Sequence, residues 1–544
     1  MNVFGRCNQQ KNKGVRVTPF WILVVIATIL YVDCLTNPCI VKKKYIPFGM
    51  SNHGLSTFPW SPSATSSLSA HNKQKEDTSL GDFASSLNNN TEQQLKEYHF
   101  NRFRKFRTKP YSAPHINKVL LLSDLHMDYP ANQDWLLNLC KTNDIIGIYG
   151  REEEDMLDYS RTMIIIAGDV SHDLEILKWT FQTLQSKFAE VSFTIGNHEL
   201  WLDKEKKRKV PLATKLDAND DDDITTNSSR LCQPSGKGDG CTDSLEKLEK
   251  VLKLCVDEHV HIGPVKIGSP SSGTSSGSNN NVVEQPLWVI PLLSWHHLSF
   301  DTEPQIEGWG GIPTARKVVA DYRRTVWPSP LSSLDSSVAE FLDGLNGIIL
   351  DLDEITNIEK EDTVPPMLLT FSHFLPRIEL LPEKRYLSLP TLHSCVGSTF
   401  LETRLRQLNT SAENGTDENP HLHAFGHSHL AWDQTIDGIR YVHVPLAYPK
   451  EWQQRRRSLE IGSMKGEVSE KRFPVCIWDG SLVEQKSDNN DDVNNRSGFP
   501  SHWLGGWWSK YYTVMPRQPQ RNKELAPWVA KRFRQVLWIP LLFC

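Results

Sequence analysis

The sequence predicts an α/β fold, because short apolar runs alternate with a helical pattern. Five runs each end abruptly in Asp, Asn or His, as buried strands do at the edge of a sheet. They are 118–124 (KVLLLSD), 163–169 (MIIIAGD), 191–199 (VSFTIGNHE), 367–373 (MLLTFSH) and 422–429 (LHAFGHSH). Between the second and third runs, apolar residues recur at helical steps, at Leu174, Leu177, Phe181, Leu184 and Phe188. Strand, helix and strand in this order predict a βαβ unit with parallel strands.

The first 41 residues predict a targeting or anchoring segment. A basic N-terminal region, residues 1–17, precedes an apolar segment at 18–41. Its core at 20–32, apolar except for Thr28, matches the length of a signal peptide better than the roughly 20 residues of a spanning helix. A cleaved signal peptide and a retained membrane anchor both stay open. We therefore expect the secretory pathway, an ER-derived organelle or a plastid, with membrane association through residues 19–41.

Composition divides the rest of the chain. Residues 42–114 are largely polar and without periodicity, which predicts a disordered linker. The folded domain is expected at 115–480, with disordered insertions near 204–244, 268–281 and 409–419. A polar linker at 481–500 leads to an aromatic C-terminal extension at 501–544, which we expect to pack onto the domain. Runs at 440–447 and 473–478 predict antiparallel strands of a second sheet.

Charge and cysteine content exclude two classes of function. The net charge of -5 gives no global electrostatic case for binding nucleic acid. The 10 cysteines form no CxxC pair and none lies at the end of the five strand-like runs, which argues against a structural thiolate zinc site. No nucleic-acid partner is expected.

The polar residues that end the five runs predict a metal centre. Asp, His and Asn provide oxygen and nitrogen ligands that suit Mn, Fe or Zn. Two cations about 3.5–4 Å apart can share a carboxylate and a hydroxide that attacks phosphorus in line. Such a centre needs one bridging carboxylate and roughly three further ligands per metal. The candidates are Asp124, His126, Asp169, Asn197, His373, His427 and His429. A glycine precedes three of them, at 168, 196 and 426, where a missing Cβ permits a sharp turn.

These motifs resemble the calcineurin-like metallophosphoesterases. The match comprises SDLH at 123–126, GD at 168–169, GNHE at 196–199, FSH at 371–373 and GHSH at 426–429, in the family's order. The resemblance covers about 118–447 and implies a four-layer α/β/β/α sandwich with a dinuclear metal site at its edge. It also implies that Asp169 bridges two metals. By the same resemblance, one site is completed by Asp124, His126 and His429, and the other by Asn197, His373 and His427.

The resemblance assigns catalysis to His198, which contacts the substrate phosphate in the family as an acid or a transition-state stabiliser. Glu199 is expected to orient the turn. The protein Ser/Thr phosphatases carry GDxHG and GDxVDRG blocks, whereas this chain has SDLHMD and GDVSHD and lacks the Arg. The segments 294–304, 372–377 and 432–449 are similar to a plant, algal and bacterial group of single-domain phosphoesterases.

Other polar residues have both a functional and a structural interpretation. Arg377 is four residues beyond a predicted ligand and can bind a phosphate oxygen or form a surface ion pair. His296 follows an apolar run and is a second candidate for substrate binding. Three other histidines alternate with apolar residues, which favours strand positions for His421, His423 and His443.

The resemblance implies a metal-dependent hydrolase of phosphate esters with a metal-bridging hydroxide as in-line nucleophile. The alternative is a non-catalytic calcineurin-like scaffold or a membrane-associated binding protein. Scaffold members of such folds lose ligands, whereas all seven ligands and His198 are present here. The expected partner is a phosphorylated substrate, and monoester and diester both stay open.

Overall fold

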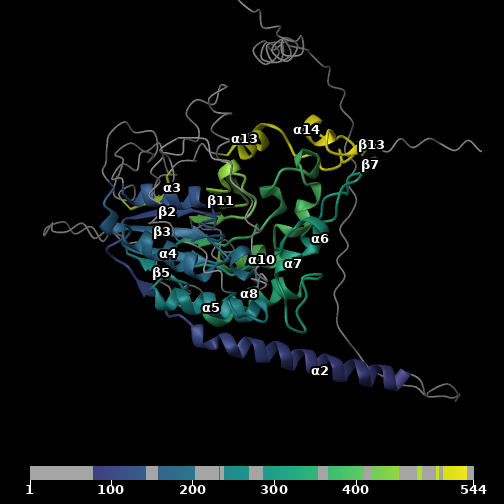
Figure 1. Ribbon diagram of the computed structural model, residues 1–544, viewed down its shortest axis with the longest axis horizontal. Coiled ribbons are helices and arrows are strands. Elements are labelled where there is room, and N and C mark those ends of the chain that lie inside the picture. The colour runs from purple at the N-terminus through teal and green to yellow at the C-terminus, as the bar shows by residue number, and fades with distance from the viewer. Residues whose placement is uncertain are drawn as a thin grey trace, which may run out of the picture. The chain divides into compact units, whose positions relative to one another are not determined.

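In the computed structural model of the chain, two β-sheets carry the predicted strands (Figure 1). The structure describes residues 78–141, 157–202, 232, 238–268, 286–352, 366–409, 420–451, 474–480, 498–500 and 506–535. The predicted segments 1–17 and 18–41, and most of 204–244, 268–281, 409–419 and 481–500, lie outside these residues. Among the helices that the structure describes, none combines the length and apolar character needed to cross a membrane.

The first sheet has 4 strands in the order β12-β2-β3-β4. Strands β2 (Lys118–Leu122), β3 (Thr162–Ala167) and β4 (Glu190–Thr194) are parallel, and β12 (Val475–Asp479) runs antiparallel to β2. The parallel strands are buried almost throughout, as expected for runs of Val, Leu and Ile that are covered on both faces. Helix α4 (Leu174–Gln185) joins β3 to β4, which confirms the predicted βαβ unit.

The second sheet has 7 strands in the order β1-β5-β6-β8-β9-β11-β10. Its strands are β1 (Tyr111–Ser112), β5 (Val265–Ile267), β6 (Leu287–Pro291), β8 (Met367–Phe371), β9 (His421–Phe425), β11 (Ile439–His443) and β10 (Trp432–Ile436). Strands β6, β8, β9 and β11 are parallel to one another. A short pair, β7 (Trp309–Gly310) and β13 (Arg534–Gln535), forms a separate ladder.

Helices cover the outer faces of the sheets. Helix α4 packs on β4, beside α3 (Pro130–Lys141) and α5 (Ser244–Asp257). On the second sheet, α10 (Thr399–Leu408) packs beside α8 (Ser337–Ile349), and its Glu402 accepts a hydrogen bond from the Tyr441 hydroxyl of β11. Between the sheets, the Thr194 hydroxyl of β4 donates to the Leu292 carbonyl beyond β6 at 2.8 Å. The predicted α/β/β/α sandwich is confirmed.

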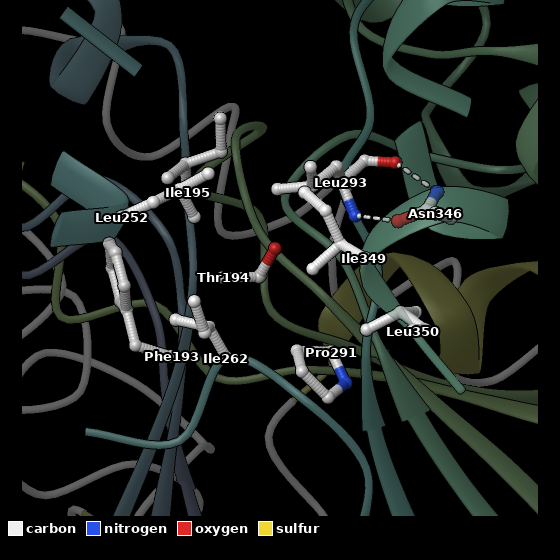
Figure 2. Close-up of a pocket in the computed structure, with 10 residues that line it drawn as sticks. All are labelled: Phe193, Thr194, Ile195, Leu252, Ile262, Pro291, Leu293, Asn346, Ile349 and Leu350. Carbon is white, nitrogen blue, oxygen red and sulfur yellow. Dashed lines mark hydrogen bonds between the residues drawn. The ribbon is translucent and has the colours of Figure 1, made fainter. Parts of the chain in front are cut away.

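A small cavity lies between the sheets (Figure 2). Its volume is about 10 Å³, which is at most the room for one water molecule. The Asn346 side chain at its wall bonds to both the N–H and the carbonyl of Leu293, each at 2.8 Å. The other lining residues are mainly apolar, and no predicted metal ligand is among them. The cavity is therefore an imperfection of sheet packing rather than a substrate site.

The prediction of a disordered linker was wrong for residues 78–114. The C-terminal end of helix α2 (Thr78–Phe103) lies beside α5 and α8 (Figure 1), and a turn, Arg104–Phe106, leads from it toward β1. Phe100 stacks on Phe341 of α8 with ring centroids 4.5 Å apart, and Phe103 is fully buried. Arg102 pairs with Glu249 of α5 at 2.9 Å. These partners lie far along the chain, and the polar composition of the linker does not predict contacts with them.

The prediction that 440–447 and 473–478 share a sheet was also wrong. Strand β11 pairs with β9 in the second sheet, whereas β12 pairs with β2 in the first. Both segments are apolar strands, but sheet membership depends on long-range pairing that local patterns do not encode.

The aromatic extension packs onto the domain, as predicted, through α13 (Trp507–Val514) and α14 (Pro527–Ala530). The Ser509 hydroxyl of α13 accepts from the Asp433 N–H of β10 at 3.2 Å. Arg517 donates to the Leu381 carbonyl at 2.7 Å and pairs with Glu303. The extension thus closes the edge of the second sheet beside β10.

Candidate metal centre

The seven predicted ligands meet at one place, where strands of both sheets end. Asp124, Asp169 and Asn197 follow β2, β3 and β4 of the first sheet, while His373 and His427 follow β8 and β9 of the second. The His427 N–H donates to Asp124 Oδ1 at 2.8 Å, a direct bond between the two sets of strand ends. The site therefore exists only when the two sheets are packed together.

The first ligand cluster contains Asp124, His126, Asp169 and His429, each with a donor atom within 4.8 Å of the others. The Nε2 atoms of His126 and His429 lie 2.9 Å apart, and His429 Nε2 is 3.5 Å from Asp124 Oδ1. His429 Nδ1 donates to Glu451 Oε2 at 2.8 Å, which leaves the Nε2 lone pair facing the cluster. His429 is thus oriented as a ligand of a cation in the first cluster.

The second ligand cluster contains Asp169, His373 and His427, and Asn197 lies against its two histidines. Asn197 Oδ1 lies 3.0 Å from both His373 Nε2 and His427 Nδ1, and those two nitrogens are 3.2 Å apart. Ligand atoms at roughly 2.0–2.2 Å from one metal ion are separated by about 3 Å when their bonds are near right angles. The triangle has the size of one face of a coordination shell.

Hydrogen bonds outside this triangle fix which atoms face inward. His373 Nδ1 donates to the Ala167 carbonyl at 2.9 Å, and His427 Nε2 donates to the Cys395 carbonyl at 3.0 Å. The Asn197 amide donates to Asp321 Oδ1 at 2.8 Å. With both imidazoles neutral, the three inward atoms each present a lone pair and can ligate one cation.

Asp169 belongs to both clusters, as expected of a bridging carboxylate. Its Oδ1 atom accepts a hydrogen bond from the backbone N–H of His198 at 3.0 Å and lies 3.3 Å from His373 Nε2. The facing histidines, His373 first among them, hold the pKa of Asp169 well below its usual range despite burial. The carboxylate is therefore charged at neutral pH and available to cations.

Five of the seven ligands have a left-handed backbone, which is uncommon for residues other than glycine. Their φ angles are between 44° and 71°, at Asp124, His126, Asp169, His427 and His429. Backbone strain of this kind persists only where the surrounding structure imposes it, and it concentrates at functional sites. Here it turns each side chain out of its strand direction and into the shared site.

Two glycines are required because the ligands approach their backbone closely. A Cβ atom on Gly196 would lie 2.2 Å from Asp169 Oδ1. A Cβ atom on Gly168, whose φ is +79°, would lie 2.5 Å from His373 Nδ1. Gly168 thus makes the predicted sharp turn, whereas Gly196 is needed for space alone.

Glu199 holds the two turns of the first sheet together. Its carboxylate accepts from the backbone N–H groups of Gly196 and Val170 at 2.7 Å, of Ser171 at 3.0 Å and of Asp169 at 3.1 Å. Burial raises the pKa of Glu199 to about 7, while the backbone donors oppose that shift. Through these bonds Glu199 orients the turn, as the sequence suggested.

His198 lies beside the clusters rather than within them. Its ring stacks on Trp201 with centroids 3.6 Å apart, and its Nε2 atom is 3.5 Å from the Tyr448 hydroxyl and 3.8 Å from Asp169 Oδ2. Burial lowers the pKa of His198. The neutral imidazole keeps one N–H next to the two clusters. The resemblance to the calcineurin-like family implied a contact with the substrate phosphate at this place.

The structure does not bring the two predicted substrate residues into the site. The Arg377 guanidinium pairs with Glu379 at 2.9 Å, Glu402 at 3.1 Å and Asp437 at 2.7 Å, which is the ion-pair alternative. His296 is buried, and its Nε2 atom lies 3.5 Å from Asp321 Oδ2. His296 therefore stands behind the second cluster, separated from it by Asp321 and Asn197.

Four residues near the site were not identified from the sequence as part of it. His443 Nε2 donates to Asp124 Oδ2 at 2.9 Å, and the Tyr448 ring stacks on His126 at 4.1 Å. Asp321 and Glu451 bind the outer atoms of ligands. No local motif marks any of the four. By contrast, His421 and His423 bond to Thr370 within the second sheet, in agreement with their predicted strand role.

Comparisons with known proteins agree with this geometry. Residues 117–261 match the model of the calcineurin-like phosphoesterase family. A curated relative is the [acyl-carrier-protein] phosphodiesterase PptH of Mycobacterium tuberculosis, 23% identical over 339 residues that span 62% of this chain and 79% of that protein.

Two solved structures also align, with low similarity. The crystal structure of phosphopantetheinyl hydrolase (PptH) from Mycobacterium tuberculosis has 18% identity, covers 63% of this chain and 94% of its own, and gives a TM-score of 0.35. A putative 5′-nucleotidase from Staphylococcus aureus has 12% identity, covers 60% and 48%, and gives a TM-score of 0.23.

The matched segment contains Asp124, His126, Asp169, Asn197 and His198, and the fold brings the three remaining ligands to them from the second sheet. The chain therefore contains a calcineurin-like phosphoesterase domain, and its similarity to a phosphodiesterase supports a metal-dependent phosphoesterase.

Proposed function

We propose that this chain hydrolyses phosphodiesters at a centre of two metal ions, of Mn, Fe or Zn. The observation that carries the two-metal proposal is the pair of clusters that share Asp169. The second cluster supports it most strongly, because three outward hydrogen bonds orient three acceptor atoms toward one point. Two ions bound there would supply positive charge for the phosphoryl oxygens and an activated water as in-line nucleophile.

The residues around the clusters have separate tasks in this reaction. Asp169, which both clusters share, would ligate both ions, and Glu199 holds the Asp169 turn through backbone bonds. His198 donates its N–H to a phosphoryl or leaving-group oxygen, next to the Tyr448 hydroxyl. The Tyr448 ring covers one face of His126 and limits access of water to that side of the first cluster.

Two observations favour a diester over a monoester. The curated relative in Mycobacterium tuberculosis is named as a phosphodiesterase. Within the described ranges, no Lys or Arg side chain bonds to the seven ligands or to His198. A monoester dianion would benefit from such a cation more than a singly charged diester, since the Coulomb attraction scales with the charge.

The test uses metal-depleted protein that is reloaded with Mn²⁺ or Zn²⁺. Hydrolysis of bis(4-nitrophenyl) phosphate is expected only after reloading, with kcat/KM at least about tenfold above that of 4-nitrophenyl phosphate. A preference for the monoester would overturn the substrate class. Absence of turnover with both esters, despite bound metal, would favour the non-catalytic scaffold.

A further inference from the structure

We propose that Asp321 is a positioning residue that turns the side-chain oxygen of Asn197 toward the second metal and holds Trp201 against His198. The inference rests on the proposed two-metal centre. Asp321 begins the short helix α7 (Asp321–Arg324) and is 1% exposed. It is separated from Asn197 by 124 positions in the sequence and lies outside the segment that matches the family model.

One oxygen of Asp321 receives two hydrogen bonds from the turn that carries the ligand. Asp321 Oδ1 accepts from Asn197 Nδ2 at 2.8 Å and from Trp201 Nε1 at 2.7 Å. Both donors are buried, so each would lose a hydrogen bond that water cannot replace if the carboxylate were removed. Asp321 Oδ2 lies 3.5 Å from His296 Nε2 on the other side of the carboxylate.

The bond to Asn197 determines which end of the amide faces the metal. An amide presents an oxygen or an NH2 group of nearly equal size, and only the oxygen is a suitable metal ligand. A carboxylate accepts hydrogen bonds and does not donate them, so Asp321 can pair only with the NH2 end. With that end held, Asn197 Oδ1 is 3.0 Å from His373 Nε2 and His427 Nδ1.

The reversed amide would be unfavourable at both ends. Its oxygen would face the Asp321 carboxylate, and its NH2 group would point into the second cluster, where it offers no lone pair to a cation. Without Asp321, neither orientation of the Asn197 amide would be favoured over the other by this hydrogen bond. The carboxylate therefore acts on the metal through Asn197, without contacting the metal itself.

The bond to Trp201 extends the same control to His198. The Trp201 ring lies 3.6 Å from the His198 ring between centroids, and the two planes are inclined by 31°. The indole N–H bond to Asp321 fixes the rotation of Trp201 and therefore the surface on which His198 rests. One carboxylate thus positions a ligand of the second metal and the adjacent imidazole.

The test compares metal binding by Asp321→Ala and Asp321→Asn. Metal-depleted proteins are titrated with Zn²⁺ by calorimetry, and bound metal is measured after gel filtration. Wild type should bind about two ions. Asp321→Ala should weaken the second ion by about 10–100-fold, the usual cost of losing a partner of a ligand. Asp321→Asn keeps an acceptor oxygen toward Asn197 and should remain within a few-fold of wild type.

Asp433→Ala is the matched control, because Asp433 is also a buried carboxylate and is bonded bidentately to Arg440. This variant should still bind two ions. If Asp321→Ala does not fold, Asp321→Ser replaces it, since its hydroxyl is too short to reach Asn197. Unchanged affinity in the alanine or serine variant would overturn the inference, as would an asparagine variant as weak as alanine. Wild type that binds fewer than two ions would instead overturn the proposed two-metal function.

Discussion

His373 Nε2 lies 3.0 Å from Asn197 Oδ1, although the two residues follow strands of different sheets. Both residues are predicted ligands of the second metal, so metal binding depends on the packing of one sheet on the other. A substitution that shifts the sheets slightly is therefore expected to weaken metal binding before it unfolds the domain.

Gly196→Ala should abolish binding of at least one metal, because the added methyl group would lie 2.2 Å from Asp169 Oδ1. Gly347→Ala is the control, since a methyl group at this exposed position of α8 meets nothing within 4 Å. The control should gain roughly 0.5–1 kcal/mol of unfolding free energy from helix propensity. Metal content and thermal unfolding measure the two effects, and full metal occupancy in Gly196→Ala would count against the close approach described here.

His198→Ala should keep both metals and lower kcat by roughly 10²–10⁴ if the imidazole acts in acid or electrostatic catalysis. A smaller loss for diesters with nitrophenolate leaving groups than for alkyl diesters would assign it the role of general acid. An equal loss across leaving groups would assign electrostatic stabilisation. Retained metals with unchanged kcat for every substrate would show that His198 takes no part in the reaction.

Acidification should destabilise the domain partly through His421. Burial lowers the pKa of His421 to about 3 in the folded chain, against 6.5 ordinarily. Between those values the unfolded chain binds more protons, so stability is present above pH 6.5 and is lost as pH falls toward 3. The loss at pH 4 should be on the order of 1–3 kcal/mol. His421→Gln keeps a donor for Thr370 and should flatten the pH dependence of denaturant unfolding, and an unaltered slope would refute the assignment.

We propose that the first fifty residues direct the chain to the ER, a plastid or another membrane compartment. The support is the apolar segment at 18–41 behind a basic region. A fluorescent protein fused to residues 1–50 should leave the cytosol, whereas the same fusion with residues 18–41 deleted should stay there. Diffuse cytosolic fluorescence from the first fusion is the contrary result.

Much of the centre could be predicted from the sequence because its ligands follow directly on apolar strands. A strand that ends in GD, GNH or GHSH places its side chain at the sheet edge by local chemistry alone. Asp321 and Glu451 lacked such a signal, since each reaches its ligand only after the chain has folded back over it. Arg377 shows the same limit, because its three carboxylate partners come from separate elements.

The fold was predictable to a similar extent. Strand and helix periodicity located β2, β3, β4 and α4, of which β3, α4 and β4 form the predicted βαβ unit. The sheet assignment of β12 and the docking of α2 depended on partners more than 200 residues away, such as Leu121 for Val475 and Phe341 for Phe100. Local patterns carry no information on such pairings.

The most direct test of the two-metal account is the metal content of Asp169→Asn beside that of wild type. The bridging carboxylate lies in both clusters, so the substitution should remove the shared charge from two sites at once. Wild type should retain about two ions per chain after gel filtration. The variant should retain fewer than one, with a near-native circular dichroism spectrum and no measurable hydrolysis of bis(4-nitrophenyl) phosphate. Two ions per chain and near-normal turnover in Asp169→Asn would contradict the account.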